Sequence, residues 1–322
     1  MGNPVSDFID NIENGIKNIL VSGITNEFEF ISDVINSNFK GTAGSTSLTH
    51  TLLTQHPYNF TGGSGSTGGG FAGDTWTAIK GMCDTAVVPI ATLILTVIIA
   101  TDLINQIVSG NNMKEFDDSL FMKWLLKSVC GILLVSHTYD IASGLYSIGT
   151  GVAGTALSTL LGTGAELSEG TLSTFKTQLQ SCEIASLILI FLICLLVLLM
   201  ALAMTMVIIA VLVSRMMEAF MYLGVAPIPM ATMMNSSWSG MGKTWIKNVL
   251  ALSFQGLFII IALAIFKTIY DSVIVSICKP SASGVSDLKI ITKCATLAGY
   301  SLVLIMTMLR SGQISKSIFS GS

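Results

Sequence analysis

The feature that most constrains the fold is a long apolar run from Ile184 to Val213 that contains no charged residue. At about 1.5 Å of rise per residue, a helix over this range is about 45 Å long. The hydrocarbon core of a bilayer is only about 30 Å thick. The run therefore predicts a membrane-spanning helix that tilts or protrudes from the bilayer.

The amino-acid composition is also typical of an integral membrane protein. It is 51% hydrophobic and 11% charged with a mean hydropathy of +0.73, whereas soluble domains carry about 25% charged residues. A net charge of -3 with 16 Lys+Arg argues against a nucleic-acid-binding protein, which would show a basic face. A conduit for nucleic acid is not excluded, because a conduit should not bind its cargo tightly.

Apolar length predicts an all-α polytopic membrane protein with about five transmembrane helices. The predicted spans are residues 87–108, 120–139, 184–213, 248–269 and 295–309. Ahead of them, residues 1–40 repeat apolar positions at helical spacing and predict an amphipathic region on a membrane surface, on a partner or on the chain itself. Residues 41–80 are rich in Gly, Ser and Thr and predict a linker. Residues 81–322 form the predicted transmembrane domain.

Residues 141–161 are uncharged but rich in small side chains. They form either a sixth span or, in the interpretation we prefer, a helix that continues the second span and packs in an oligomer. A seam of small residues repeats every fourth position and suits close helix contact: Ser143, Ser147, Gly151 and Thr155.

Two prolines interrupt an apolar helix between the third and fourth spans. Pro227 and Pro229 lie inside Ala219–Met234, and a helix broken there loses backbone hydrogen bonds. At membrane depth such a break is tolerated only where protein or water covers it, which predicts a re-entrant or in-plane element. The candidate gate or interface residues are Arg215, Glu218, Pro227, Pro229, Trp238 and Gln255. Arg215 and Glu218 are three apart, a spacing that allows them to pair on one helix face; otherwise they line water or reach the headgroups from span ends.

Other polar residues fall within or beside the spans. Asp102 and Lys127 should pair, line water or reach the headgroups from span ends, because a charge facing lipid costs several kcal/mol. Five spans with modest positive-inside bias place the N-terminus outside and the C-terminus inside. The cysteines at the outer face under this topology are Cys83, Cys182, Cys278 and Cys294. They form disulfides, as Cys83 with Cys182 and Cys278 with Cys294, or stay thiols.

No constellation for catalysis, a metal or a cofactor appears in the sequence. The histidines are scattered without metal spacing. Gly242-Lys243-Thr244 lacks the earlier glycine and the preceding strand of a phosphate loop. The sequence therefore predicts a protein that is not an enzyme.

A family resemblance rests on the central stretch and on its flanks. Tyr222-Leu223, Val225 to Met233, Trp238, Met241-Gly242 and Ala251 to Gly256 resemble the core of TrbL-type polytopic channel subunits. Asn111 to Met113, Phe121 to Trp124 and Ser315 to Phe319 are similar to the group on conjugative elements of Gram-positive bacteria. The resemblance implies an oligomeric channel or scaffold subunit of a type IV secretion machine in the bacterial cytoplasmic (inner) membrane. It also implies other secretion subunits and the secretion ATPases as partners, and transient contact with a relaxase–DNA substrate.

The alternative is a secondary transporter or pore for a small solute that works alone. Transporters usually contain repeats with paired broken helices. The sequence shows one proline-broken element and no counterpart in the first half, which favours the channel subunit.

Overall fold

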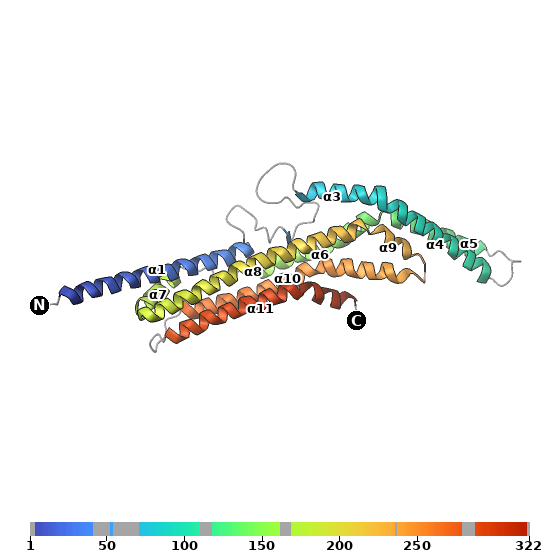
Figure 1. Ribbon diagram of the computed structural model, residues 1–322. Helices are drawn as coiled ribbons and strands as arrows, with labels where there is room; N and C mark the ends of the chain where they lie inside the picture. The colour runs from blue at the N-terminus through green and yellow to red at the C-terminus, as the bar shows by residue number, and fades with distance from the viewer. Residues whose placement is uncertain are drawn as a thin grey trace. The chain divides into compact units, whose positions relative to one another are not determined.

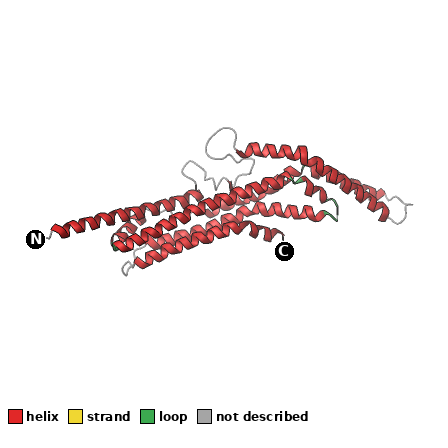
Figure 2. Ribbon diagram, viewed as in Figure 1, coloured by secondary structure: helices red, strands yellow, loops and turns green. Residues whose placement is uncertain are grey.

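A computed structural model gives the fold of residues 4–40, 52–53, 71–109, 118–161, 169–235, 237–278 and 287–320. Helices account for nearly all of these residues, and no strand occurs among them (Figure 2). The fold is that of an all-α polytopic membrane protein, as predicted. Most of residues 41–70, the greater part of the predicted linker, lies outside the described ranges.

The helices follow one another along the chain (Figure 1). Their bounds are α1 Pro4–Lys40, α3 Phe71–Met82, η2 Cys83–Val87, α4 Val88–Ser109, α5 Asp118–Ser136, α6 Thr138–Leu161, α7 Glu169–Gln180, α8 Ile184–Gly224, α9 Pro227–Thr232, α10 Ser239–Cys278 and α11 Asp287–Ser320. Helix α3 begins at Phe71, so helical structure covers the last part of the segment predicted as linker. The N-terminal region is one helix, α1.

Four stretches of the described chain are long and apolar enough to cross a membrane: Thr75–Asn105, Ile184–Gly224, Ser239–Ile277 and Ile290–Phe319. A fifth crossing is added if the bent pair Phe121–Ser136 and Thr138–Leu160 counts as one span. Helices α8 and α10 contain 41 and 40 residues. Each is therefore about 60 Å long, twice the hydrocarbon thickness, and extends well beyond its predicted span.

Two irregularities in the first half of the chain have local causes. The π-helix η2, in which the amide of Val88 donates to the carbonyl of Cys83, comes just before Pro89. A proline has no amide and its ring clashes with the carbonyl four residues earlier, which disturbs the α-helical ladder. At His137 the chain bends by 67° between α5 and α6. There the Thr138 hydroxyl donates to the Leu134 carbonyl at 2.5 Å, a back-bond of the type that bends helices.

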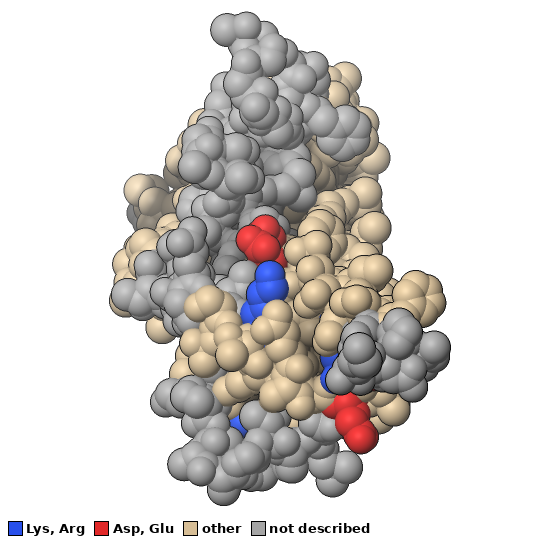
Figure 3. Space-filling view, turned by 90° about the vertical axis from the view of Figure 1, so that its left-hand side faces the viewer, with Lys and Arg blue, Asp and Glu red and all other residues tan. Residues whose placement is uncertain are grey.

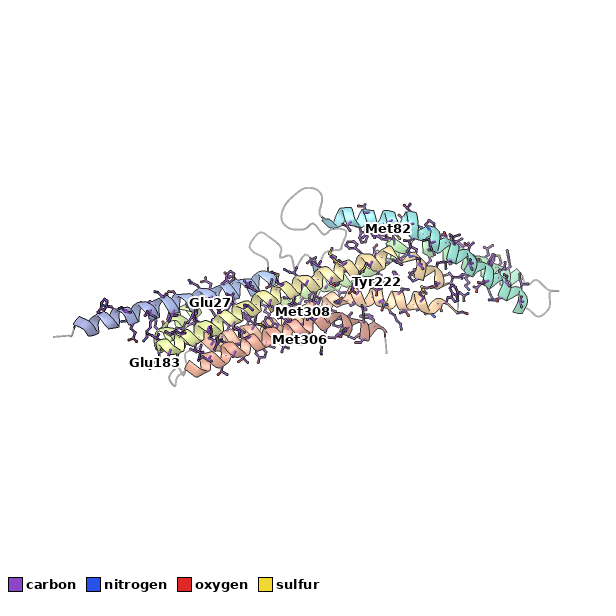
Figure 4. All side chains as sticks on the ribbon, in the orientation of Figure 1. Glu27, Met82, Glu183, Tyr222, Met306 and Met308 are labelled. Carbon is purple, nitrogen blue, oxygen red and sulfur yellow. The ribbon has the colours of Figure 1, made fainter. Side chains whose placement is uncertain are left out.

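The described chain divides into two compact units, and α6, α8, α10 and α11 contribute residues to both. In the first unit, the second half of α1 packs on α7 and on α8. The rings of Phe28 and Phe175 lie 5.1 Å apart, and Gly23 faces the Phe191 ring so closely that an added Cβ would meet it at 3.2 Å. Glu27 also lies on α1 (Figure 4). Its Oε2 is buried without a hydrogen-bond partner among the described residues, and burial raises the pKa of this carboxyl above 4.5.

The core of the second unit is aromatic and surrounds the break after α8. Trp76 stacks edge-on against Tyr139 at 5.1 Å and against Phe220 at 6.2 Å. Other buried members of this core are Cys83, Ala142, Tyr146, Ala219, Leu223, Ala226, Met230, Trp245, Val249 and Leu252. A smaller group of Ala91, Leu95, Val135 and Ala231 joins α4, α5 and α9.

Large apolar side chains remain exposed along the candidate spans. On α8 they include Ile188, Leu192, Leu199 and Met206, and on α4 they include Leu93 and Val97. On the face shown in Figure 3, uncharged side chains make up most of the described surface. Surfaces of this kind suit contact with lipid chains or with other membrane subunits.

Candidate functional site

The break between α8 and α10 is built around the short helix α9. Pro227 and Pro229 lie in its first turn, where backbone amides have no acceptor within the helix, so missing amides cost little there. The remaining donors find partners: Ala226 donates to the Leu223 carbonyl at 3.3 Å and Ile228 donates to the Val225 carbonyl at 3.2 Å. The broken backbone is thus satisfied within the protein.

Protein also covers this short helix. Both prolines, Met230, Ala231 and Thr232 are buried, and α9 packs against α4 and α5. On its other side, Gly242 of α10 lies so close that an added Cβ would meet the Pro229 carbonyl oxygen at 2.6 Å. A glycine at this position is therefore a packing requirement, and the Gly-Lys-Thr sequence lies on a helix rather than in a phosphate-binding loop.

Arg215 is the most unusual buried residue of the second unit. Its side chain is only 2% exposed. Nε donates to the Leu252 carbonyl and Nη2 donates to the Ser253 carbonyl, both at 3.1 Å, and the guanidinium lies 5.4 Å from the centre of the Tyr146 ring. No carboxylate forms a salt bridge with it in the described part of the chain. The guanidinium therefore pins α8 to the backbone of α10 without a counter-ion.

Ser253 extends this contact to a third helix. Its hydroxyl donates to the Tyr146 carbonyl at 2.9 Å and accepts from the Gly149 amide at 3.1 Å. The two helices approach so closely that a Cβ on Gly149 would lie 2.0 Å from the Ser253 Oγ and 2.4 Å from its carbonyl oxygen. We call Arg215, Ser253, Tyr146, Gly149 and Gly256 the three-helix junction. Gly256 belongs to it because its Cβ position lies 2.8 Å from Arg215 Nη1.

The end of α11 attaches beside the junction. Gln255 is buried and donates from Nε2 to the Ser311 hydroxyl at 3.3 Å, and the Ser315 hydroxyl donates to the Ala251 carbonyl. Lys316 forms an ion pair of 3.7 Å with Glu218 of α8. The last part of α11 therefore holds two of the three helices that meet at the junction, α8 and α10.

Arg215 and Glu218 do not pair with one another, although their spacing allows it. A spacing of three residues on a helix puts two side chains near one another. The Arg215 guanidinium, however, donates to two backbone carbonyls of α10 instead. Glu218 instead stays half-exposed and pairs with Lys316. Trp238 is 57% exposed and lies outside the junction. Pro227 and Pro229 are buried in α9, and Gln255 is buried in α10 beside the junction.

The two intramembrane candidates pair with one another. Lys127 of α5 donates to Asp102 of α4, and next to them the Trp124 indole donates to the Ile99 carbonyl at 3.1 Å. This pair links α4 to α5, and pairing is one of the alternatives that the sequence left open.

The small-residue seam of α6 does not face the three-helix junction. Ser147, Gly151 and Thr155 are exposed, Ser143 is half-buried, and nothing lies within 4 Å of a Cβ added to Gly151. The seam hydroxyls donate to carbonyls of their own helix, as Ser147 does to Gly144 at 2.7 Å. The close contact of α6 is made by Gly149 instead, which the fourfold repeat did not include.

The cysteines of the described chain are thiols in the structure. Cys83 is buried in the aromatic core, and the Cys182 thiol donates to the Gln178 carbonyl at 3.5 Å. Cys294 and Cys194, a residue of α8, are both buried. Cys83 and Cys182 are thus thiols, one of the two alternatives that the sequence left open, and the side chain of Cys278 lies outside the described residues. No cluster of metal-ligating side chains occurs in the described ranges.

Residues 53–227, more than half of the chain, match the family model described as TrbL/VirB6 plasmid conjugal transfer like protein. The match includes Asp102, Lys127, Tyr146 and Arg215 and ends at the first proline of α9. No curated protein and no solved structure matches the chain.

Proposed function

We propose a role for this chain from its family, because it belongs to the TrbL/VirB6 plasmid conjugal transfer like proteins. Membership makes it a membrane subunit of conjugal transfer machinery. In our proposal it is an oligomeric channel or scaffold subunit of a type IV secretion machine. It sits in the bacterial cytoplasmic membrane with its N-terminus outside and its C-terminus inside. It helps a relaxase–DNA substrate to cross, and separate secretion ATPases supply the energy.

The observation that carries this proposal is the three-helix junction beside the covered break. A guanidinium without a counter-ion is a costly group to bury, by several kcal/mol for the ion alone. Here it binds two carbonyls of α10 from a position nine residues before the end of α8 at Gly224. Buried polar groups of this kind can fix the register of helices, which an apolar contact alone leaves free to slide. A subunit that braces or gates an export path needs such a fixed register.

The first test is DNA transfer from a donor that lacks the gene, with and without the gene restored. Loss of transfer with normal growth, rescued by complementation, supports a dedicated conjugation subunit, whereas undiminished transfer refutes it. Rescue with Arg215→Met then tests the junction. We expect a protein that inserts and accumulates normally while transfer falls at least tenfold. Transfer at the wild-type level would remove the junction from the mechanism.

One observation favours the second candidate, a transporter for a small solute. The 67° bend at His137 is a second break, in the first half of the chain, where the sequence showed none. Paired breaks are typical of transporters. Solute accumulation by cells that express this chain alone would support the transporter. Dependence of its stability on other transfer subunits would support the channel subunit.

A further inference from the structure

One turn of α10 accepts hydrogen bonds from two neighbouring helices. The Arg215 guanidinium of α8 donates to the Leu252 and Ser253 carbonyls, both at 3.1 Å. The Ser315 hydroxyl of α11 donates to the carbonyl of Ala251, the residue before them. Three consecutive carbonyls of α10 therefore have a donor from another helix. We call them the shared carbonyls.

The shared carbonyls also keep their partners inside the helix. Helix α10 is uninterrupted in the structure, so these carbonyls accept from the amides four residues further on, which belong to Gln255, Gly256 and Leu257. If the helix opens at this turn, the shared carbonyls lose those amides but keep the donors from α8 and α11. Within a membrane, donors from neighbouring helices allow a helix to break because they satisfy the backbone groups that are freed. Opening is therefore easier at this turn than at a turn whose carbonyls have only amide partners.

A glycine stands in the same turn. Gly256 lies in the interior of α10, where glycine is less favourable than every other residue except proline. The contact with Arg215 accounts for it, because a Cβ on Gly256 would lie 2.8 Å from Nη1. The residue that lets the guanidinium approach the α10 backbone thus also weakens the helix at the shared carbonyls. Phe258, two residues later, is the last residue of α10 in the second unit.

We propose that the shared carbonyls and Gly256 form a hinge in α10. In the open form, the side-chain donors of Arg215 and Ser315 still hold the shared carbonyls, so α8 and α11 keep their register on α10. The freed amides of the turn are taken up by 3₁₀ or π pairing. A bend here changes the direction in which α10 leaves the second unit after Phe258. The inference goes beyond the proposed function, since it rests on the hydrogen bonds of α10 alone.

Hydrogen–deuterium exchange of the full-length protein in nanodiscs tests the hinge. Mass spectrometry measures the exchange rate of the amides in residues 254–258 relative to residues 262–270 of the same helix. Arg215→Met leaves two shared carbonyls without a donor in the open form, so we expect opening to become rarer and exchange to be at least about tenfold slower. Ser315→Ala removes the donor of one shared carbonyl and should slow exchange about threefold to tenfold.

A clamp on a rigid helix would give the opposite result, because the loss of either donor would loosen α10 and speed exchange at this turn. Unchanged or faster exchange in either folded variant therefore overturns the hinge, and Ser315→Ala decides alone if Arg215→Met does not fold. Ser301→Ala is the matched control, because Ser301 is a buried serine of α11 whose hydroxyl donates to the Leu297 carbonyl of its own helix at 3.0 Å. It should leave the exchange rate of residues 254–258 unchanged, and slower exchange there would also overturn the hinge. The exchange rate is measured without DNA transfer, so the hinge and the proposed function are tested separately.

Discussion

Replacing Arg215 by lysine should destabilise the protein, whereas replacing it by methionine should leave stability close to that of the wild type. Arg215→Lys keeps a buried charge but can no longer donate to the Leu252 and Ser253 carbonyls together. The loss of one hydrogen bond from a charged group costs about 1.5–3 kcal/mol. Weaker contact with the Tyr146 ring costs about 0.5–2 kcal/mol more. The expected loss is therefore about 2–5 kcal/mol of unfolding free energy.

Arg215→Met has two opposing effects on the free energy of unfolding. It removes both hydrogen bonds, worth about 3–6 kcal/mol together, and it also removes the desolvation penalty of the guanidinium, which is several kcal/mol. The two carbonyls lie inside α10 and keep their helical amide donors, so neither is left without a partner. These changes nearly cancel.

Thermal unfolding of the purified protein in nanodiscs, followed by tryptophan fluorescence, measures both variants. For a chain of this length, a loss of about 2–5 kcal/mol corresponds to an apparent midpoint about 3–7 °C lower for Arg215→Lys. Arg310→Lys is the control, because Arg310 is exposed and its replacement should not shift the midpoint. If Arg215→Lys unfolds at the wild-type temperature, or if Arg215→Met is the less stable of the two, the account of the buried guanidinium is refuted.

Three further predictions concern other parts of the fold. Pro227→Ala combined with Pro229→Ala should lower DNA transfer at least tenfold while the protein still inserts and accumulates, because a longer α8 displaces α9; normal transfer would exclude the break from the mechanism. Gly149→Ala should reduce accumulation severely because its Cβ would lie 2.0 Å from Ser253 Oγ, whereas Gly151→Leu should fold normally and disrupt only self-association on native gels; an unchanged oligomer would contradict the role of the seam. Glu27→Gln should raise stability at pH 7, since burial raises the folded-state pKa of this carboxyl and its ionisation then opposes folding as pH rises above the unfolded value of 4.5. That gain in stability should disappear below about pH 4, where the Glu27 carboxyl is protonated in both the folded and the unfolded state. Glu29→Gln, a control at an exposed position, should show no gain in stability at any pH.

The length of the apolar runs and the positions of the prolines were sufficient to predict the broad architecture, which consists of spanning helices and one break. The charge-free Ile184–Val213 run predicted a long spanning helix, and the two prolines predicted the break, because both effects depend on local chemistry: the transfer of apolar side chains to lipid and the missing proline amide. Local sequence did not set the helix ends. Helix α8 continues to Gly224 and α10 begins at Ser239, since tertiary packing stabilises turns that hydropathy alone would leave outside a span.

The partners of the polar side chains were decided by the tertiary structure. Arg215 binds backbone carbonyls, and every residue has a carbonyl, so no sequence pattern marks Leu252 and Ser253 as acceptors. The contact between Gly149 and Ser253 joins residues 104 positions apart, and the only sequence signal was that Ser253 and Gly256 fall within the stretch that resembles the family. On α6, small residues recur at every fourth position from Ser143 to Thr155. That pattern could not show that Gly149, which does not belong to it, makes the close helix contact. The sequence thus determined which segments enter the membrane and where the chain breaks, because these depend on each segment's own solvation. The contacts of the buried Arg215 and of the close-packed glycines depend instead on distances between segments that are far apart in the sequence. Only the folded chain fixes those distances.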